Sequence, residues 1–341
     1  MKSLLNEFYT ALENRCRFRQ GGRILAAVSG GPDSVALLRL LAIARQRLQL
    51  QLRCAHVDHG LHSASKRQAK WVAKLCRTWD IPCTIIKLKP KEIRLKARTV
   101  GPEAAARFYR YRALSKAIRT LGCDALATGH TLDDQAETIL LRILRGSGLK
   151  GLAGMGYTTR LEGMTVMRPL LGVSKSDLLN ALRRNQISFV QDPTNRTEDF
   201  TRNRLRAQVA PRLDRLNPRW REHLIGLGDD AEEVHEWLYA KVQKLLPQIL
   251  TRTAKHQVDF SVKRLAALPQ PLRMEALFQG LDRLNAPRGS INRTHWVQLS
   301  HWIEDGSTIP RTASWPGGID VTLAGKTLSF RTRSAGDRLC G

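Results

Sequence analysis

Short apolar runs alternate with amphipathic stretches over residues 23–130. Runs of five or six apolar residues predict buried strands, whereas apolar positions three or four residues apart predict helices. The predicted strands are residues 24–28, 52–57, 83–88 and 124–128, and the predicted helices are residues 34–45, 63–79, 133–144 and a stretch that begins at Pro102 and Glu103. Strands that alternate with helices are typical of βαβ units, so we predict an α/β fold with a doubly wound, mostly parallel sheet.

The pattern changes after residue 145. Glycines predict a loop over residues 146–156, and Ser174 with Asp177 predicts a capping box before a helix at residues 175–184. Further on, the expected elements are a long helix at residues 219–250, more helices to about residue 303 and a small hairpin at residues 318–331. We therefore predict an α/β domain at residues 1–215, a mainly helical domain at residues 216–330 and a tail at residues 331–341.

The chain is strongly basic. Its 341 residues include 56 Lys and Arg against 30 Asp and Glu, a formal net charge of +26. A compact protein with this charge repels itself unless an acidic partner binds, and nucleic acid is the usual partner because neutralised phosphates release counterions. A generally basic, solvated surface is the alternative. Aromatic residues are sparse, which argues against a stacking platform for single strands.

The six cysteines show no recognisable metal or disulfide pattern. No two form C-x-x-C, and no Cys/His group has the spacing of a zinc site. The N-terminus lacks the apolar segment of a secretory signal, and no run approaches the ~18 apolar residues of a membrane span. We predict a cytoplasmic protein without a disulfide framework or a membrane contact.

The first predicted strand runs directly into the string S-G-G-P-D-S, which precedes a predicted helix. Glycines allow a sharp turn and a close approach to a ligand, and the amides of such a loop point at an anion. A carboxylate beside phosphate makes sense if it holds Mg²⁺ or accepts hydrogen bonds from loop amides. An ordinary strand–turn–helix junction is the alternative, and neither a Walker A nor a G-x-G-x-x-G motif is present. The predicted phosphate-binding residues are Ser29, Gly30, Gly31, Pro32, Asp33 and Ser34.

Three further polar segments follow strands or lie on helices. They are H-V-D-H-G-L-H at residues 56–62, E-A-A-A-R-F-Y-R-Y-R at residues 103–112 and G-H-T-L-D-D-Q-A-E-T at residues 129–138. An arginine on the second segment is suited to neutralise a transferred phosphate, and the carboxylates of the third to hold Mg²⁺ or an amine. The simpler interpretations are a solvated loop, a basic helix face and acidic residues that favour the start of a helix.

The S-G-G-x-D-S string resembles the PP-loop or ATP-pyrophosphatase superfamily, whose members grip the pyrophosphate of ATP and attack its α-phosphate. The full series of motifs resembles the tRNA(Ile)-lysidine synthetases over residues 22–212. Its other members are an R-G-x-G-x-x-G-L loop at residues 145–152, an R-P-L-L strand at residues 168–171, D-P-T-N at residues 192–195 and R-N-x-x-R at residues 202–206. Residues 331–338 resemble the start of a further domain that longer members carry.

The resemblance implies an ATP- and Mg²⁺-dependent ligase. Such an enzyme adenylates the C2 oxygen of the wobble cytidine of tRNA(Ile) with a CAU anticodon, and free L-lysine then displaces AMP to form lysidine. The implied catalytic residues are Asp33, Arg110, Asp134, Glu137 and Arg202, the further nucleotide-binding residues are His56, Asp58 and His130, and the Mg²⁺ ligands are Asp33 and Asp134. A homodimer is left open.

Three other classes of protein compete with this interpretation. A tRNA thiolase of the same superfamily would need a C-x-x-C pair for sulfur or iron–sulfur chemistry. An amide-forming ligase of the GMP-synthetase kind would need a source of ammonia. A non-catalytic basic RNA-binding protein would leave the acidic residues around the loop unexplained.

Overall fold

The computed structural model describes residues 2–60, 65–190, 201–284, 291–305 and 309–333. The chain divides into two compact units, Met1–Ala231 and Glu232–Gly341, which are described separately. The boundary between them falls inside one long helix, α11 (Trp220–Ile249). Among the described residues, no helix has the length and apolar character needed to cross a membrane.

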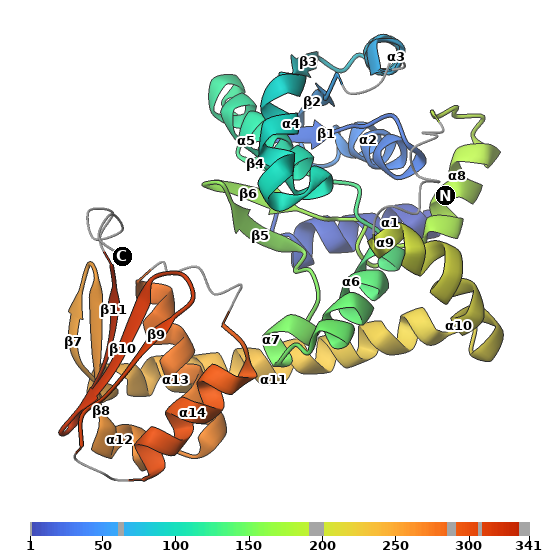
Figure 1. The fold of residues 1–341 in the computed structure, drawn as a ribbon. Helices are drawn as coiled ribbons and strands as arrows, with labels where there is room; N and C mark the ends of the chain where they lie inside the picture. Colours follow the sequence, from blue (N-terminus) through green and yellow to red (C-terminus); the bar gives the residue numbers. More distant parts are fainter. Residues whose placement is uncertain (1, 61–64, 191–200, 285–290, 306–308, 334–341) are drawn as a thin grey trace. The chain divides into compact units, whose positions relative to one another are not determined.

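A six-stranded sheet forms the centre of the first unit (Figure 1). Its strands lie in the order β3-β2-β1-β4-β6-β5, and only β5 runs antiparallel to its neighbour. Their bounds are β1 Arg23–Ala27, β2 Gln51–Asp58, β3 Cys83–Lys87, β4 Ala125–Ala127, β5 Thr158–Leu161 and β6 Met164–Met167. All four predicted strands are present, and the predicted doubly wound, mostly parallel fold is confirmed.

Both faces of this sheet are buried. Along β1, Ile24 and Ala26 belong to one hydrophobic cluster, whereas Leu25 belongs to another that contains Leu114. Such two-sided burial explains why the strands of a parallel sheet are continuous apolar runs. The helices of the unit are α1 Lys2–Thr10, α2 Pro32–Ala44, α3 Ser65–Thr78, α4 Pro90–Val100, α5 Pro102–Leu121, α6 Leu132–Arg145, α7 Leu149–Leu152, α8 Lys175–Arg184, α9 Thr201–Arg204 and α10 Ala210–Leu216, with π-helical turns at Ala11–Arg15 and Leu205–Val209.

Two local expectations for this unit are wrong. The predicted loop at residues 146–156 contains the short helix α7, which Arg142 holds by donating hydrogen bonds to the carbonyls of Gly151 and Gly154. The R-P-L-L segment is a turn and not a strand, because β6 ends at Met167 and the amide of Leu171 bonds back to the carbonyl of residue 168. In both cases side-chain and turn hydrogen bonds, which periodicity does not register, decide the local structure.

The second unit combines helices with a five-stranded antiparallel sheet in the order β7-β8-β11-β10-β9. The long predicted helix and the predicted hairpin are both confirmed, the latter as β10 paired with β11. Residues 250–261 were expected to be helical but form β7 and β8. Val258 and Phe260 both lie in the core and are two residues apart, as in a strand. This alternating pattern covers too few residues to be recognised in the sequence. The remaining elements are β7 Leu250–Ala254, β8 Gln257–Ser261, α12 Val262–Ala266, α13 Gln270–Arg283, α14 Arg293–Glu304, β9 Arg311–Trp315, β10 Ile319–Ala324 and β11 Thr327–Thr332.

Candidate active site

The S-G-G-P-D-S loop is folded around the hydroxyl of Ser34. The amides of Ser29 and Gly30 each donate to Ser34 Oγ at 3.2 Å, and this hydroxyl donates to the carbonyl of Gly31 at 2.9 Å. Gly30 has a φ of +98°, a conformation that a side chain would strain. The loop therefore has a defined shape between β1 and α2, at the carboxyl end of the central strand.

This loop lies where ligands bind in doubly wound sheets. After β1 the chain proceeds to β2 and β3 on one side of β1, whereas β4 lies on its other side, so a crevice opens between the ends of β1 and β4. Gly129 follows β4 and contacts the loop so closely that a Cβ there would lie 2.8 Å from the carbonyl oxygen of Asp33. A cavity of about 410 Å³ occupies this position.

Asp33 lies in the cavity wall, and the negative charge of its carboxylate is only partly balanced by a neighbouring cation. Its Oδ2 is 3.5 Å from Nζ of Lys175, which begins α8. Its Oδ1 is buried and has no hydrogen-bond partner among the described residues. Burial raises the pKa of Asp33, nearby Asp134 raises it further, and Lys175 opposes both. An unpaired carboxylate oxygen in a cavity is a suitable ligand for a cation.

Asp134 serves two purposes at the start of α6. Its Oδ2 accepts hydrogen bonds from the amide and hydroxyl of Thr131, which completes a capping box. Its Oδ1 accepts a hydrogen bond of 2.8 Å from Nη2 of Arg206. Burial alone would raise the pKa of Asp134, but the Thr131 amide, His130 and Arg206 together hold it below its usual value. The helix-start interpretation of this residue is therefore correct, and the residue also lines the cavity.

Glu137 lies one turn further along α6 and is 6% exposed. Arg206 contacts both of its oxygens, and Arg202 lies 3.4 Å from Oε2 while donating to the hydroxyl of Thr138. Burial raises the pKa of Glu137 despite these cations. The predicted i,i+3 pair, Asp134 and Glu137, thus shares one guanidinium.

The histidine segment after β2 divides between structural and cavity positions. His56 is buried, and its Nδ1 lies 2.8 Å from the carbonyl of Val28, which fixes the ring. Asp58 accepts a hydrogen bond from the amide of Gly60 and shapes the turn. Burial, Arg110 and His56 lower the pKa of His59 to about 4. Its Nδ1 has no partner in the described part of the chain.

Arg110 and His130 both line the cavity, Arg110 from helix α5 and His130 from the segment after β4. Arg110, on α5, stacks beside the ring of Tyr111, and burial lowers its pKa. His130 lies 2.8 Å from the hydroxyl of Thr128 through Nδ1, and burial lowers its pKa to about 4. At neutral pH the cavity therefore combines a charged guanidinium with an uncharged imidazole.

Most of the predicted site residues meet in this cavity. The wall contains Ser29, Gly31, Pro32, Asp33, Ser34, His56, Arg110, His130 and Asp134. Four predicted residues lie outside the wall. Gly30 and Asp58 are adjacent to wall residues in sequence, and Glu137 is hydrogen-bonded to the wall residue Arg206. Arg202 contacts Glu137 and Thr138, which are themselves outside the wall. The D-P-T-N motif, His62 and residues 334–338 lie outside the described residues.

The wall also contains residues outside the predicted set, among them His59, Gln68, Lys175 and Arg206. Gln68 donates to the carbonyl of Ser29 at 2.9 Å and so supports the loop from α3. Arg206 ends the R-N-x-x-R motif, which was a usable signal. Lys175 had no comparable signal, because a lysine at the start of a capped helix is usually solvated.

The fold and the loop define a PP-loop protein, and the family model described as PP-loop domain matches residues 2–213. A tRNA(Ile)-lysidine synthase of Bradyrhizobium sp. strain BTAi1 is 37% identical over 329 residues, which cover 92% of this chain and 88% of the relative. A tRNA(Ile)-lysidine synthase of Symbiobacterium thermophilum is 34% identical over 304 residues, which cover 79% of this chain and 63% of the relative. The chain belongs to the tRNA(Ile)-lysidine synthase family of PP-loop enzymes, as its motifs predicted.

A solved structure supports the fold alone. The U34-tRNA thiolase NcsA from Methanococcus maripaludis, solved with its [4Fe-4S] cluster, superposes with a TM-score of 0.58 at 19% identity. The match covers 68% of this chain and 79% of the thiolase.

Proposed function

We propose that this enzyme adenylates the C2 oxygen of the wobble cytidine of tRNA(Ile) with a CAU anticodon and then replaces AMP with free L-lysine, which forms lysidine. The observation that carries the proposal is the convergence of the phosphate loop, Asp33, Asp134 and Arg110 on one cavity at the switch point of the sheet. The names of the relatives supply the substrate class.

The loop and the cations around it are suited to the polyphosphate of ATP. Backbone amides at the start of α2 and the hydroxyl of Ser29 offer donors to the pyrophosphate end, and the hydroxyl of Ser34 fixes the shape of the loop. Arg110 and Lys175 bring positive charge to the same cavity. Charge that develops on the α-phosphate during attack by the cytidine oxygen is stabilised by such fixed cations, and AMP transfer releases pyrophosphate.

The residues also fit a magnesium ion. Asp33 offers a buried oxygen without a partner among the described residues, and Asp134 provides a second carboxylate whose charge raises the pKa of Asp33. A bound Mg²⁺ would relieve this repulsion and neutralise phosphate charge. We therefore assign Asp33 and Asp134 as its ligands.

The carboxylates of Asp134 and Glu137 are our candidate site for the lysine amine. They already share one cation, the guanidinium of Arg206, so the pair is built to hold positive charge. In the second step the deprotonated amine attacks C2 of the adenylated base, the bond to the AMP oxygen breaks, and the amine proton passes to a base. His130, which is uncharged at neutral pH, and Glu137 are the two candidates for this base.

Lysine transfer to RNA is the direct test. The protein is incubated with bulk bacterial tRNA, ATP and radiolabelled lysine, and the tRNA is digested to nucleosides. We expect label in one modified cytidine and equal amounts of AMP and pyrophosphate. ADP as the main product, or ATP turnover without lysine transfer, would contradict the proposal; the absence of any turnover would favour an RNA-binding protein without activity. Sedimentation of the same preparation tests the homodimer.

A further inference from the structure

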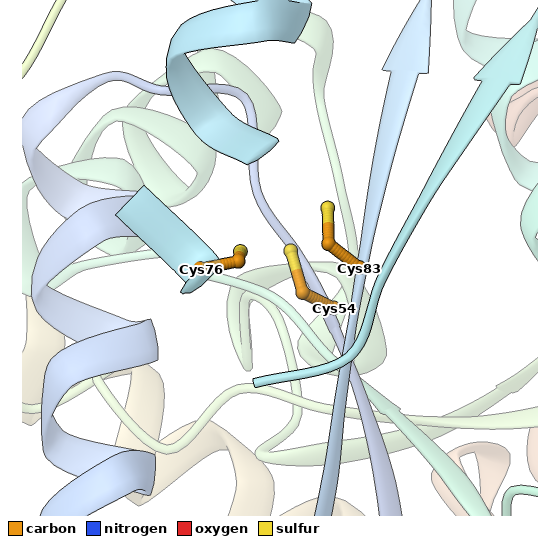
Figure 2. A group of neighbouring side chains, drawn as sticks. All are labelled: Cys54, Cys76 and Cys83. Atoms are coloured by element: carbon orange, nitrogen blue, oxygen red, sulfur yellow. The ribbon is translucent and has the colours of Figure 1, made fainter. Parts of the chain in front are cut away.

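Three cysteine side chains meet on the face of the sheet that α3 covers (Figure 2). Cys54 comes from β2, Cys76 from α3 and Cys83 from β3, and their sulfur atoms all lie within 4.8 Å of one another. Cys54 and Cys83 are direct partners in the parallel strand pair, and Cys76 faces them from the helix. The cluster is separate from the cavity wall described above.

The spacing of these sulfurs is close to that of a metal–thiolate site. A metal ion bound at about 2.3 Å from three sulfurs in a plane holds them about 4.0 Å apart, and a tetrahedral ion holds them about 3.8 Å apart. The sulfurs here need to close by less than about 1 Å, which small side-chain rotations supply. No fourth Cys, His, Asp or Glu in the described part of the chain joins the group.

We propose that Cys54, Cys76 and Cys83 bind one thiophilic d¹⁰ cation, Cu(I) or Zn(II), through three sulfur atoms. Thiolate ligands select such soft ions, and three ligands suit a trigonal Cu(I) or a Zn(II) completed by one water. Each thiol that binds loses its proton to solvent, and no electron transfer is involved.

The competing interpretation is that three thiols simply fill the hydrophobic core. Cys54 and Cys76 are 0% exposed and pack in the same cluster as Val72, so buried thiols are expected there. Two features favour a site. The three sulfurs come from three separate elements and converge, and Cys83 is only partly buried, which leaves an approach for an ion.

An ion at this position would stabilise the packing of α3, the helix that supports the phosphate loop. It would join α3 to both β2 and β3, and α3 carries Gln68, which donates to the carbonyl of Ser29. On β2, His56 follows Cys54 by two residues and therefore lies on the same face of the strand. The expected effect is on stability and not on the chemistry of the cavity.

The test uses the full chain, stripped of metal and kept reduced. Cd(II) is added first because its bond to thiolate absorbs in the ultraviolet, and Zn(II) and Cu(I) are then titrated separately against a competing chelator. We expect one ion per chain and a rise in the melting temperature on binding. The affinities of the two titrations identify which ion the site prefers. None of these measurements depends on ATP or tRNA, so their failure leaves the proposed ligase activity unaffected.

Serine variants locate the site. Cys83→Ser should weaken binding by at least about 100-fold, whereas Cys123→Ser, which removes another buried thiol outside the cluster, should bind like the parent. Cys76→Ser replaces the first variant if that protein does not fold, as judged by circular dichroism. Less than 0.1 ion per chain in the parent, or undiminished binding in the cluster variants, would overturn the proposal and leave the thiols as core residues.

Discussion

Arg206 donates hydrogen bonds to both carboxylate oxygens of Glu137. Its Nε donates to Oε1 at 2.6 Å and its Nη2 to Oε2 at 2.8 Å. The same Nη2 also reaches Asp134 at 2.8 Å. The guanidinium of one residue thus occupies the carboxylate pair that we assign to the lysine amine, so the amine must compete with Arg206 or share the pair with it. The separate roles that we propose for Asp134 and Glu137 on α6 can therefore be tested by mutation.

Glu137→Gln should separate the two half-reactions. The amide keeps the shape of the side chain but removes the charge that balances an ammonium. Loss of a charged partner from a desolvated cation costs about 2–5 kcal/mol, which is tens- to thousands-fold in rate. We expect tRNA-dependent pyrophosphate release to continue in part while lysine transfer at subsaturating lysine falls by this factor. Parallel assays of pyrophosphate and of labelled tRNA measure both steps.

Asp134→Asn provides the comparison, because Asp134 is assigned to Mg²⁺ as well as to the amine. Both half-reactions should be lost together. Lysine transfer at the parental rate in Glu137→Gln would show that the amine binds elsewhere.

Asp33→Asn should abolish pyrophosphate release without lowering stability. Loss of one electrostatic group in a preorganised site costs about 100-fold or more in rate. Burial raises the pKa of Asp33, so its charge disfavours the folded state, and removing that charge should leave the melting temperature unchanged or higher. Asp80→Asn, at a fully exposed carboxylate, is the control and should leave both quantities unchanged. A large drop in melting temperature for Asp33→Asn would contradict this account.

Gly129→Ala should distort the phosphate loop. The added Cβ would lie 2.8 Å from a carbonyl oxygen of the loop, and overpacking of this kind costs about 1–3 kcal/mol. We expect a lower melting temperature together with weaker ATP binding in calorimetry. Gly148→Ala adds its Cβ in open space and should retain both properties. Parental ATP affinity in Gly129→Ala would show that the end of β4 does not shape the nucleotide site.

Acid should destabilise the folded chain through His59. Its pKa is about 4, below the ~6.5 of an unfolded histidine, so the unfolded chain binds the proton more tightly. The free energy of unfolding therefore falls as the pH drops from about 6.5 to about 4 and is unaffected by this group above that window. Between pH 7.5 and pH 5 the melting temperature of His59→Gln should fall less than that of the parent. Exposed His301→Gln should behave like the parent; an equal acid response in both variants would remove His59 from the explanation.

RNA binding should weaken steeply with salt. Each phosphate contact contributes a slope of about −0.7 to −0.9 in log affinity against log salt. Helix α4 exposes Lys91, Arg94 and Arg98 along one side, and replacing all three with alanine should flatten the slope by up to about 2–3 units. Leu95→Ala alters the same exposed helix without changing charge and should leave the slope unchanged. A flat response in the parent would mean that the +26 charge is not used for RNA.

The sequence was sufficient to predict the structure where a single periodicity or a single helical turn determines it. Strands β1 to β4 were predicted from their short apolar runs, whereas β5 and β6 were not predicted. Asp134 and Glu137 were expected on one side of α6, and both reach the same guanidinium. The loop at Ser29–Ser34 was placed correctly because its glycines and its position after a strand act together.

The rest depends on contacts between distant segments. Arg206 reaches α6 from a segment about 70 residues later, and Lys175 reaches Asp33 from the start of another helix. Cys54, Cys76 and Cys83 are spaced 22 and 7 residues apart, and only strand pairing and helix packing bring them together. Asp58, a predicted nucleotide-binding residue at the end of β2, also accepts a hydrogen bond from the amide of Gly60, a local turn contact that the sequence did not predict.

The internal hydrogen bonds of the Ser29–Ser34 loop depend largely on one oxygen atom. Ser34 Oγ accepts from the amides of Ser29 and Gly30 and donates to the carbonyl of Gly31, so one hydroxyl joins the start of the loop to its last residue. A methyl group in its place would leave two amides and one carbonyl of the loop without this partner. The geometry of the proposed pyrophosphate receptor therefore depends on a side chain whose loss alters several backbone groups at once, and not on independent contacts that are lost one at a time.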